Sequence, residues 1–260
     1  MSKHARADGG SQEDDSGRWT GGSGKGERNT PWYIEIPIII AIALLLSIGL
    51  QTFIGRVYLI PSESMEPTLH GCADCTGDRI WVNKISTNFR DPDAGDVVVF
   101  VAPESWDGSY ITNRSQNPVV NSLQTVGSWI GVVAPDENTM VKRVMATGGQ
   151  TIQCREGDPG IMVDGQMLDQ SYIQSPPDHL VDPSTGSEAC GGPYFGPITV
   201  PEDNIWVMGD NRTNSLDSRY HIGDEYQGTV PVDDVVGFAT NIILPFNRIS
   251  SIDNPDIQAN

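Results

Sequence analysis

Two serines stand close together between two prolines, directly after a long apolar run. They are Ser62 and Ser64, and the flanking Pro61 and Pro67 restrict the backbone on either side of them. A serine hydroxyl becomes a useful nucleophile only when a neighbouring base removes its proton. The segment therefore predicts a reactive serine if the rest of the chain supplies that base, and histidine and lysine are the two candidates.

Lys142 is the stronger candidate base, because it lies in the run from Val141 to Ala146, which is otherwise apolar enough for a buried strand. Alternation along a strand sends Lys142 and Arg143 to opposite faces. If Lys142 faces the interior, desolvation opposes its charged form, its pKa falls, and the neutral amine can accept a proton. A surface lysine on an edge strand is the alternative, and this segment taken alone favours it.

The histidines offer a weaker base. Neither a Gly-x-Ser-x-Gly elbow nor another Ser-His-Asp signature accompanies any of them, and they are His4, His70, His179 and His221. A further polar run extends from Met208 to Arg219, directly after an apolar strand. By itself it is typical of a polar loop with an ion pair between Asp217 and Arg219.

Together with the run from Gly77 to Lys84, these segments resemble the type I signal peptidases, or leader peptidases, which use a Ser/Lys dyad. The motifs stand in the family's order behind the family's anchor, from about residue 32 to Leu244, and Cys72, Cys75 and Cys154 resemble actinobacterial members. The resemblance implies that Ser64 is the acylating nucleophile and Lys142 its general base. It places Ser62 in the oxyanion hole with the Ser64 N–H, and it implies that Ser215 hydrogen-bonds and orients the Lys142 amine.

The resemblance implies supporting roles for a second set of residues. Asp217 and Arg219 form an ion pair, and the loop beneath the site is shaped by Asp210, Asn211 and Arg212. Glu63 stands where glycine is usual, which bears on the oxyanion geometry, although no catalytic residue type is missing. The family's chemistry implies no metal and no organic cofactor.

The apolar run predicts a membrane anchor over residues 32–56. No charge occurs from Ile36 to Ile54, which is nearly enough for a helix to cross the hydrocarbon core. A cleavable secretory signal is the alternative, but apolar residues continue past the small-x-small pattern around Ser47. The excess of Lys25 and Arg28 over Arg56 favours a cytoplasmic N-terminal side, and the composition of residues 1–31 is typical of a disordered tail. The resemblance implies that the catalytic part is extracytoplasmic, on a bacterial plasma membrane.

The cysteines are even in number and lie beyond the anchor, which fits an oxidising compartment. Four cysteines allow three pairings. A zinc site or a redox pair at Cys72 and Cys75 is an alternative, but no second CxxC or histidine cluster completes it. Local structural disulfides, Cys72 with Cys75 and Cys154 with Cys190, are favoured.

Short β-rich runs punctuated by Gly, Pro, Asn and Asp predict a mainly β fold behind the single helix. We expect a signal-peptidase-type fold with a catalytic β core in residues 57–155 and 204–248, a smaller inserted subdomain of strands and loops in 156–203, and a C-terminal tail in 249–260. One helical stripe, containing Val119, Leu123, Val126 and Ile130, is separate from these runs. Packing of this helix on the core is the commoner arrangement, and a helix lying on the membrane is the alternative.

The charge balance limits the partners. With 16 basic against 34 acidic residues, the net charge is −18, so nucleic acid is an unsuitable partner. The resemblance implies that exported preproteins are cut after small residues near the lipid surface and close to a translocon. Two other functions stay open: a membrane-anchored hydrolase using Ser64 with His70 or His221, and a noncatalytic ectodomain that binds export partners.

Overall fold

Strands make up most of the regular structure beyond the first helix in the computed structural model of the chain, which describes residues 31–72, 75–109, 115, 117–129 and 138–258. The predicted mainly β class behind one apolar N-terminal helix is therefore confirmed. The chain divides into two compact units, Met1–Ile40 and Ala41–Asn260. Of the predicted tail over residues 1–31, all but Pro31 lies outside the described residues.

Helix α1 (Trp32–Phe53) is the apolar run of the sequence. Its 22 residues rise about 33 Å, which matches a hydrocarbon core of roughly 30 Å. None of its residues is buried in the protein. By length and composition it is the one helix in the described part of the chain that could cross a membrane.

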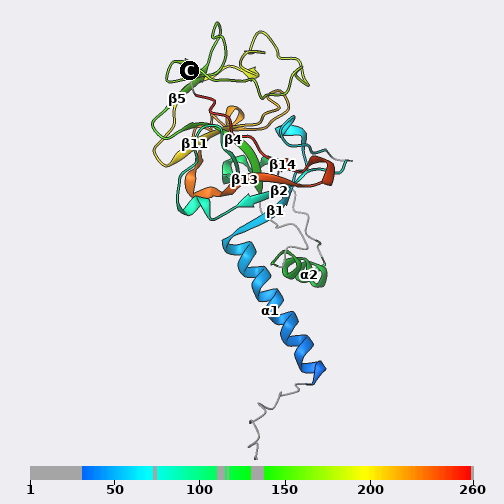
Figure 1. The fold of residues 1–260 in the computed structure, drawn as a ribbon. Coiled ribbons are helices and arrows are strands. Elements are labelled where there is room, and N and C mark those ends of the chain that lie inside the picture. The colour runs from blue at the N-terminus through cyan, green and yellow to red at the C-terminus, as the bar shows by residue number, and fades with distance from the viewer. Residues whose placement is uncertain (1–30, 73–74, 110–114, 116, 130–137, 259–260) are drawn as a thin grey trace, which may run out of the picture. The chain divides into compact units, whose positions relative to one another are not determined.

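A large antiparallel sheet carries the central part of the fold, in the order β1-β2-β13-β3-β4-β11-β12 with β14 beside β13 (Figure 1). The inner strand β3 is entirely apolar, because alternate side chains enter two separate cores. The next strand, β4, carries Lys142 and Arg143 and is buried through most of its length. The strands are β1 (Gly55–Leu59), β2 (Arg79–Asn83), β3 (Val97–Val101), β4 (Thr139–Thr147), β11 (Asn204–Met208), β12 (Val230–Pro231), β13 (Val235–Leu244) and β14 (Ser250–Ser251).

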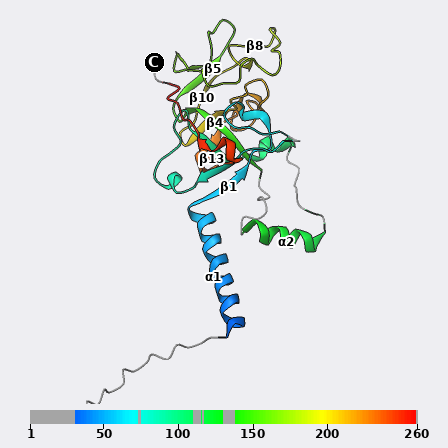
Figure 2. The same cartoon turned by 45° about the vertical axis from the view of Figure 1, so that its right-hand side comes forward.

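Two smaller sheets also belong to the unit Ala41–Asn260, and they lie at its end away from β1 (Figure 2). A stacked pair of rings, Phe195 and Trp206 at 5.4 Å between centroids, joins the four-stranded sheet to β11 through a shared core. The domain boundaries given above stay a prediction. The strands are β5 (Thr151–Cys154), β6 (Met162–Val163), β7 (Gln166–Met167) and β10 (Phe195–Thr199) in one sheet, and β8 (Gly186–Ser187) and β9 (Gly192–Pro193) in the other.

The remaining helices are short except for α2 (Pro118–Trp129). Asn117 caps α2, because its side-chain oxygen accepts the N–H of Val119 at 3.0 Å, and proline at the first helical position suits the start of a helix. The 3-10 turns are η1 (Glu63–Met65), η2 (Ser86–Asn88), η3 (Glu104–Ser109), η4 (Ser218–Tyr220), η5 (Val232–Asp234) and η6 (Phe246–Arg248).

The segment after β14 is not a loose tail. Ile257 is fully buried in the core shared with the small sheets, and its carbonyl accepts the N–H of Asp169 at 2.9 Å. The side chain of Asn254 donates to Asp96 at 3.0 Å. The segment is polar apart from Ile252 and Ile257, so its sequence did not indicate that it packs on the core.

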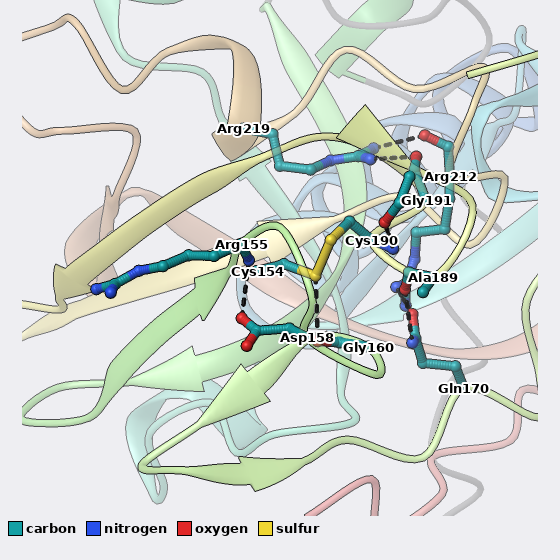
Figure 3. Close-up of a disulfide and its surroundings, with 11 residues drawn as sticks. Cys154, Arg155, Asp158, Gly160, Gln170, Ala189, Cys190, Gly191, Arg212 and Arg219 are labelled. Carbon is teal, nitrogen blue, oxygen red and sulfur yellow. Dashed lines mark hydrogen bonds between the residues drawn. A yellow bond between two sulfur atoms is a disulfide. The ribbon is translucent and has the colours of Figure 1, made fainter. Parts of the chain in front are cut away.

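Disulfides join Cys72 to Cys75 and Cys154 to Cys190. The second ties β5 to the turn that contains Gly191, as Figure 3 shows. Removing it by Cys154→Ala with Cys190→Ala is expected to lower the free energy of unfolding by about 2–4 kcal/mol, because the bond restricts the unfolded chain. Denaturant unfolding of the full chain in detergent measures the loss.

The other disulfide provides the matched control. Its cysteines are 3 residues apart rather than 36, so it closes a much smaller loop. Cys72→Ala with Cys75→Ala should therefore cost less stability. Equal losses in the two double variants would contradict the loop-length argument.

Candidate active site

Ser64 lies in the turn η1, which follows β1 and is held in place by buried side chains next to it. Met65 and Leu69 enter the core next to it. The Ser64 carbonyl accepts the N–H of Asn211 at 3.1 Å, which joins η1 to the loop after β11. The Ser64 N–H belongs to the first turn of η1, where the turn itself supplies no acceptor.

Lys142 reaches Ser64 from β4. Its Nζ lies 2.7 Å from Oγ of Ser64, and Oγ of Ser62 lies 3.3 Å from the same hydroxyl. Residues separated by 78 positions in the chain thus meet through the sheet. Among the described residues, these two groups are the hydrogen-bond partners of the Ser64 hydroxyl.

Burial changes the acid–base behaviour of Lys142. The side chain is only 5% exposed, and loss of solvation lowers its pKa from 10.5 to about 8, although the carboxylates of Asp217 and Asp210 oppose the shift. Arg219 reinforces the lowering. A substantial fraction of the amine is therefore uncharged near neutral pH, which a surface lysine would not achieve.

Asp217 and Arg219 form a fully buried ion pair behind the lysine. Nε of Arg219 lies 2.8 Å from Oδ1 of Asp217, and the guanidinium also donates to the carbonyls of Gly191 at 2.6 Å and Arg212 at 2.7 Å (Figure 3). Burial opposes the charge on Asp217, but Arg219 keeps the pKa of this carboxyl below its ordinary value. The Cys154–Cys190 disulfide lies next to Gly191 and so helps to position the Gly191 carbonyl, which accepts a hydrogen bond from Arg219.

A second buried ion pair joins β4 to the same loop. Arg143 donates through Nε and Nη2 to the two carboxylate oxygens of Asp210, at 2.9 and 2.7 Å. Thr68 donates to Asp210 at 2.5 Å, and the carbonyl of Asp253 accepts from Arg143 at 3.0 Å. Arg143 was missed as a site residue, since alternation only placed it on the face opposite Lys142.

Asn211 and Arg212 shape the loop through several contacts. Asn211 donates to the Glu63 carbonyl at 3.1 Å and to Asp178 at 2.6 Å. Arg212 donates to the Gly209 carbonyl at 3.0 Å and also binds Gln170 and Tyr172. The exposed side chain of Glu63 accepts a hydrogen bond from Asn214 at 3.2 Å, so it points away from the two serine hydroxyls.

The predicted hydrogen bond between Ser215 and the Lys142 amine is not present. Oγ of Ser215 is buried and has no partner of ordinary hydrogen-bond geometry within the described residues, while its proximity helps to lower the pKa of Asp217. Ser215 still borders the site, because a Cβ on Gly209 would collide with both its hydroxyl and the Ser64 carbonyl. The lysine amine is directed at Ser64 instead, and the orienting role of Ser215 stays a prediction.

His70 and His221, the two histidines considered as bases for Ser64, are engaged elsewhere, and His4 lies outside the described residues. His70 pairs with Glu66, and the ring of His221 stacks on Trp106 at 4.2 Å between centroids. Within the described part of the chain, no group of three or more His, Cys, Asp or Glu side chains could hold a metal ion.

The family model for signal peptidase, peptidase S26, matches residues 33–244. The chain belongs to this family. Signal peptidase I of Mycobacterium tuberculosis (strain H37Rv) is 50% identical over 219 residues, covering 82% of this chain and 73% of that protein. Probable signal peptidase I of Mycobacterium leprae is 45% identical over 244 residues, covering 89% of this chain and 82% of that protein.

Other members of the signal peptidase family are more distant. Signal peptidase I of Leptolyngbya laminosa is 33% identical over 216 residues. A crystal structure of a signal peptidase I from Enterococcus faecalis V583 matches 58% of this chain and 98% of its own, at 20% identity and a TM-score of 0.33. Family and relatives identify the chain as a signal peptidase I, a serine peptidase, and the predicted family and function are confirmed.

Proposed function

We propose that the chain removes signal peptides from exported preproteins with Ser64 as nucleophile and Lys142 as general base. The single observation that supports this dyad best is the contact of 2.7 Å between the lysine Nζ and the serine Oγ, with the lysine side chain buried and the serine partly exposed. The low pKa of Lys142, about 8, makes the neutral amine available as a proton acceptor.

In the proposed reaction, Ser64 Oγ attacks the scissile carbonyl carbon while its proton passes to Nζ of Lys142. The Ser62 hydroxyl and the Ser64 N–H stabilise the negative oxygen that forms. When the C–N bond breaks, the lysine ammonium gives its proton to the leaving amine. Lys142 then takes a proton from the water that attacks the acyl carbon, and it returns this proton to Ser64 Oγ when the ester bond breaks.

The oxyanion role of Ser62 leads to a prediction of intermediate size. Ser62→Ala is expected to lower kcat by about 10²-fold to 10³-fold, the usual cost of one lost oxyanion donor, with little change in KM. Steady-state cleavage of a preprotein measures it. Glu63→Gly, which restores the residue usual in the family, is the control and should retain activity. Full activity of the Ser62→Ala enzyme would show that Ser62 does not contribute to the oxyanion hole.

The lysine pKa sets the expected pH dependence. The base works only when uncharged, so below pH 8 the active fraction falls about tenfold per pH unit, and above the pKa of about 8 it levels off. A profile of kcat/KM against pH should therefore rise through about 8. Lys142→Arg, which stays charged throughout, should be inactive at every pH. A profile flat from pH 7 to 9, about one unit either side of the lysine pKa of about 8, would exclude this base.

We also propose the membrane arrangement. Helix α1 anchors the chain, residues before it lie in the cytoplasm, and Ser64 acts on the outer face near the lipid, where preproteins leave the translocon. Small pockets beside an added substrate strand would select small residues before the cut. Accessibility of the region beyond α1 to external protease in intact spheroplasts tests the orientation.

Incubating the detergent-solubilised chain with a tagged preprotein and mapping the new N-terminus tests the function directly. Cleavage after a small residue at the end of the signal peptide is expected. The Ser/His alternative is tested in the same assay with His70→Ala and His221→Ala, which should both remain active. Binding of the preprotein without cleavage would instead favour a noncatalytic ectodomain.

A further inference from the structure

Helix α2 has its polarity reversed relative to an ordinary surface helix. Val119, Leu123 and Val126 follow one another at helical spacing and are 67%, 68% and 52% exposed. On the opposite side, Gln124 and Thr125 are only partly exposed. These three side chains therefore face outward and do not pack on the core as predicted, while Ile130, the fourth member of the predicted stripe, lies outside the described residues.

The polar side of α2 contacts the protein in the second half of the helix, while Asn121 on the same side is exposed. Oε1 of Gln124 accepts the N–H of Ser115 at 2.9 Å. The carbonyl of Ser128 accepts from Nη2 of Arg56 at 2.7 Å, and Ser128 itself is buried. Both bonds leave the apolar stripe uncovered.

The contact with Arg56 also shows that the end of α2 lies beside the start of β1. Arg56 lies in β1, directly after α1, where the chain leaves the apolar run. The same end of the sheet carries η2, because Lys84 donates its N–H to the Ile54 carbonyl at 3.0 Å and Gly55 pairs with Asn83. Just past η2, Phe89 is 83% exposed. Large apolar side chains from separate segments are thus exposed where a membrane anchor ends.

The composition of α2 indicates what kind of surface it meets. No charged residue occurs from Pro118 to Trp129. The chain as a whole is strongly acidic, so anionic headgroups would repel rather than attract it. Attachment must therefore come from partition of the apolar side chains, not from charge.

We propose that α2 lies in the boundary between headgroups and acyl chains of the membrane that α1 crosses, with Val119, Leu123 and Val126 directed at the acyl chains. The helix is a second, shallow membrane contact of the region beyond α1. Together with α1 it holds the β1 end of the sheet at the lipid surface. The inference does not depend on the peptidase chemistry.

Site-directed labelling of the full chain tests this arrangement. All four native cysteines are in disulfides, so an introduced cysteine is the single free thiol. Leu123→Cys and the matched control Asn121→Cys, on the opposite side of the same helix, each receive an environment-sensitive fluorophore. Both proteins are placed in phosphatidylcholine vesicles, and quenching is measured with nitroxide on the lipid acyl chains and with iodide in water.

The label at position 123 should show blue-shifted emission, strong quenching by the acyl-chain nitroxide and weak quenching by iodide. The label at 121 should show the reverse. Added anionic lipid or salt should leave the difference unchanged, because α2 carries no charge. Equal quenching at both positions would overturn the proposal, and so would a label at 123 that is shielded from iodide but not quenched by lipid, which indicates a protein partner. Retained preprotein cleavage shows that both labelled chains are folded.

Discussion

Replacing Lys142 by methionine is expected to lower kcat/KM for preprotein cleavage by roughly 10⁴-fold to 10⁶-fold, the size seen when one member of a nucleophile–base pair is removed. Methionine is close to lysine in length and suits a buried position, so the sheet should keep its fold. The loss follows because Ser64 Oγ then has no group at 2.7 Å to take its proton. Initial rates of signal-peptide removal measure it.

Ser64→Ala should cause a similar loss, and the double variant should be little worse than either single one, because the two side chains act as a unit. Unchanged thermal unfolding of each variant shows that activity rather than folding was lost. Arg155→Ala, which changes an exposed side chain just past β5, is a control that should stay active. Substantial cleavage by Lys142→Met would rule out the dyad.

Asp217→Ala is expected to destabilise the protein by about 3–5 kcal/mol, because it leaves the buried guanidinium of Arg219 without its counter-charge. The carboxylate also raises the pKa of Lys142, so its removal should shift the rise of the pH profile to lower pH in any enzyme that still folds. Denaturant unfolding of the full chain in detergent and the pH dependence of kcat/KM measure the two effects.

Removing both charges is the informative comparison. Asp217→Leu with Arg219→Met replaces the pair by apolar side chains and should be more stable than Asp217→Leu alone. If the double variant were the less stable one, the cost would come from packing and not from an unpaired charge. If Asp217→Asn left the pH profile unshifted, the Asp217 carboxylate would have no influence on the pKa of Lys142.

Much of the sheet could be predicted from the sequence, because β3, β4, β11 and β13 carry apolar runs with clear ends. Lys142 was assigned through the family resemblance, because the run from Val141 to Ala146 taken alone favoured a surface lysine, whereas the structure buries it beside Ser64. Short strands such as β10 were not predicted, because Gly196 and Pro197 are typical of a loop and only pairing with β5 makes the segment a strand.

Contacts between distant segments escaped prediction for a similar reason. Nothing local indicates that Arg143 pairs with Asp210, or that Ser215 lies beside Asp217. The sequence also did not indicate where the apolar stripe of α2 points. Periodicity predicts that the apolar residues share one side of the helix, but not whether that side faces protein, lipid or water. Each of these features depends on the assembled sheet.

The docking of residues 252–258 has a consequence for any change made in that segment. Arg143 uses the Asp253 carbonyl as an acceptor, and Ile257 fills the core beside the lysine strand, so a segment remote in sequence supports the strand that carries Lys142. A variant cut before Ile252 lacks that support. Such a truncation should therefore weaken the site from a distance, and an affinity tag is best kept clear of this segment by a flexible linker.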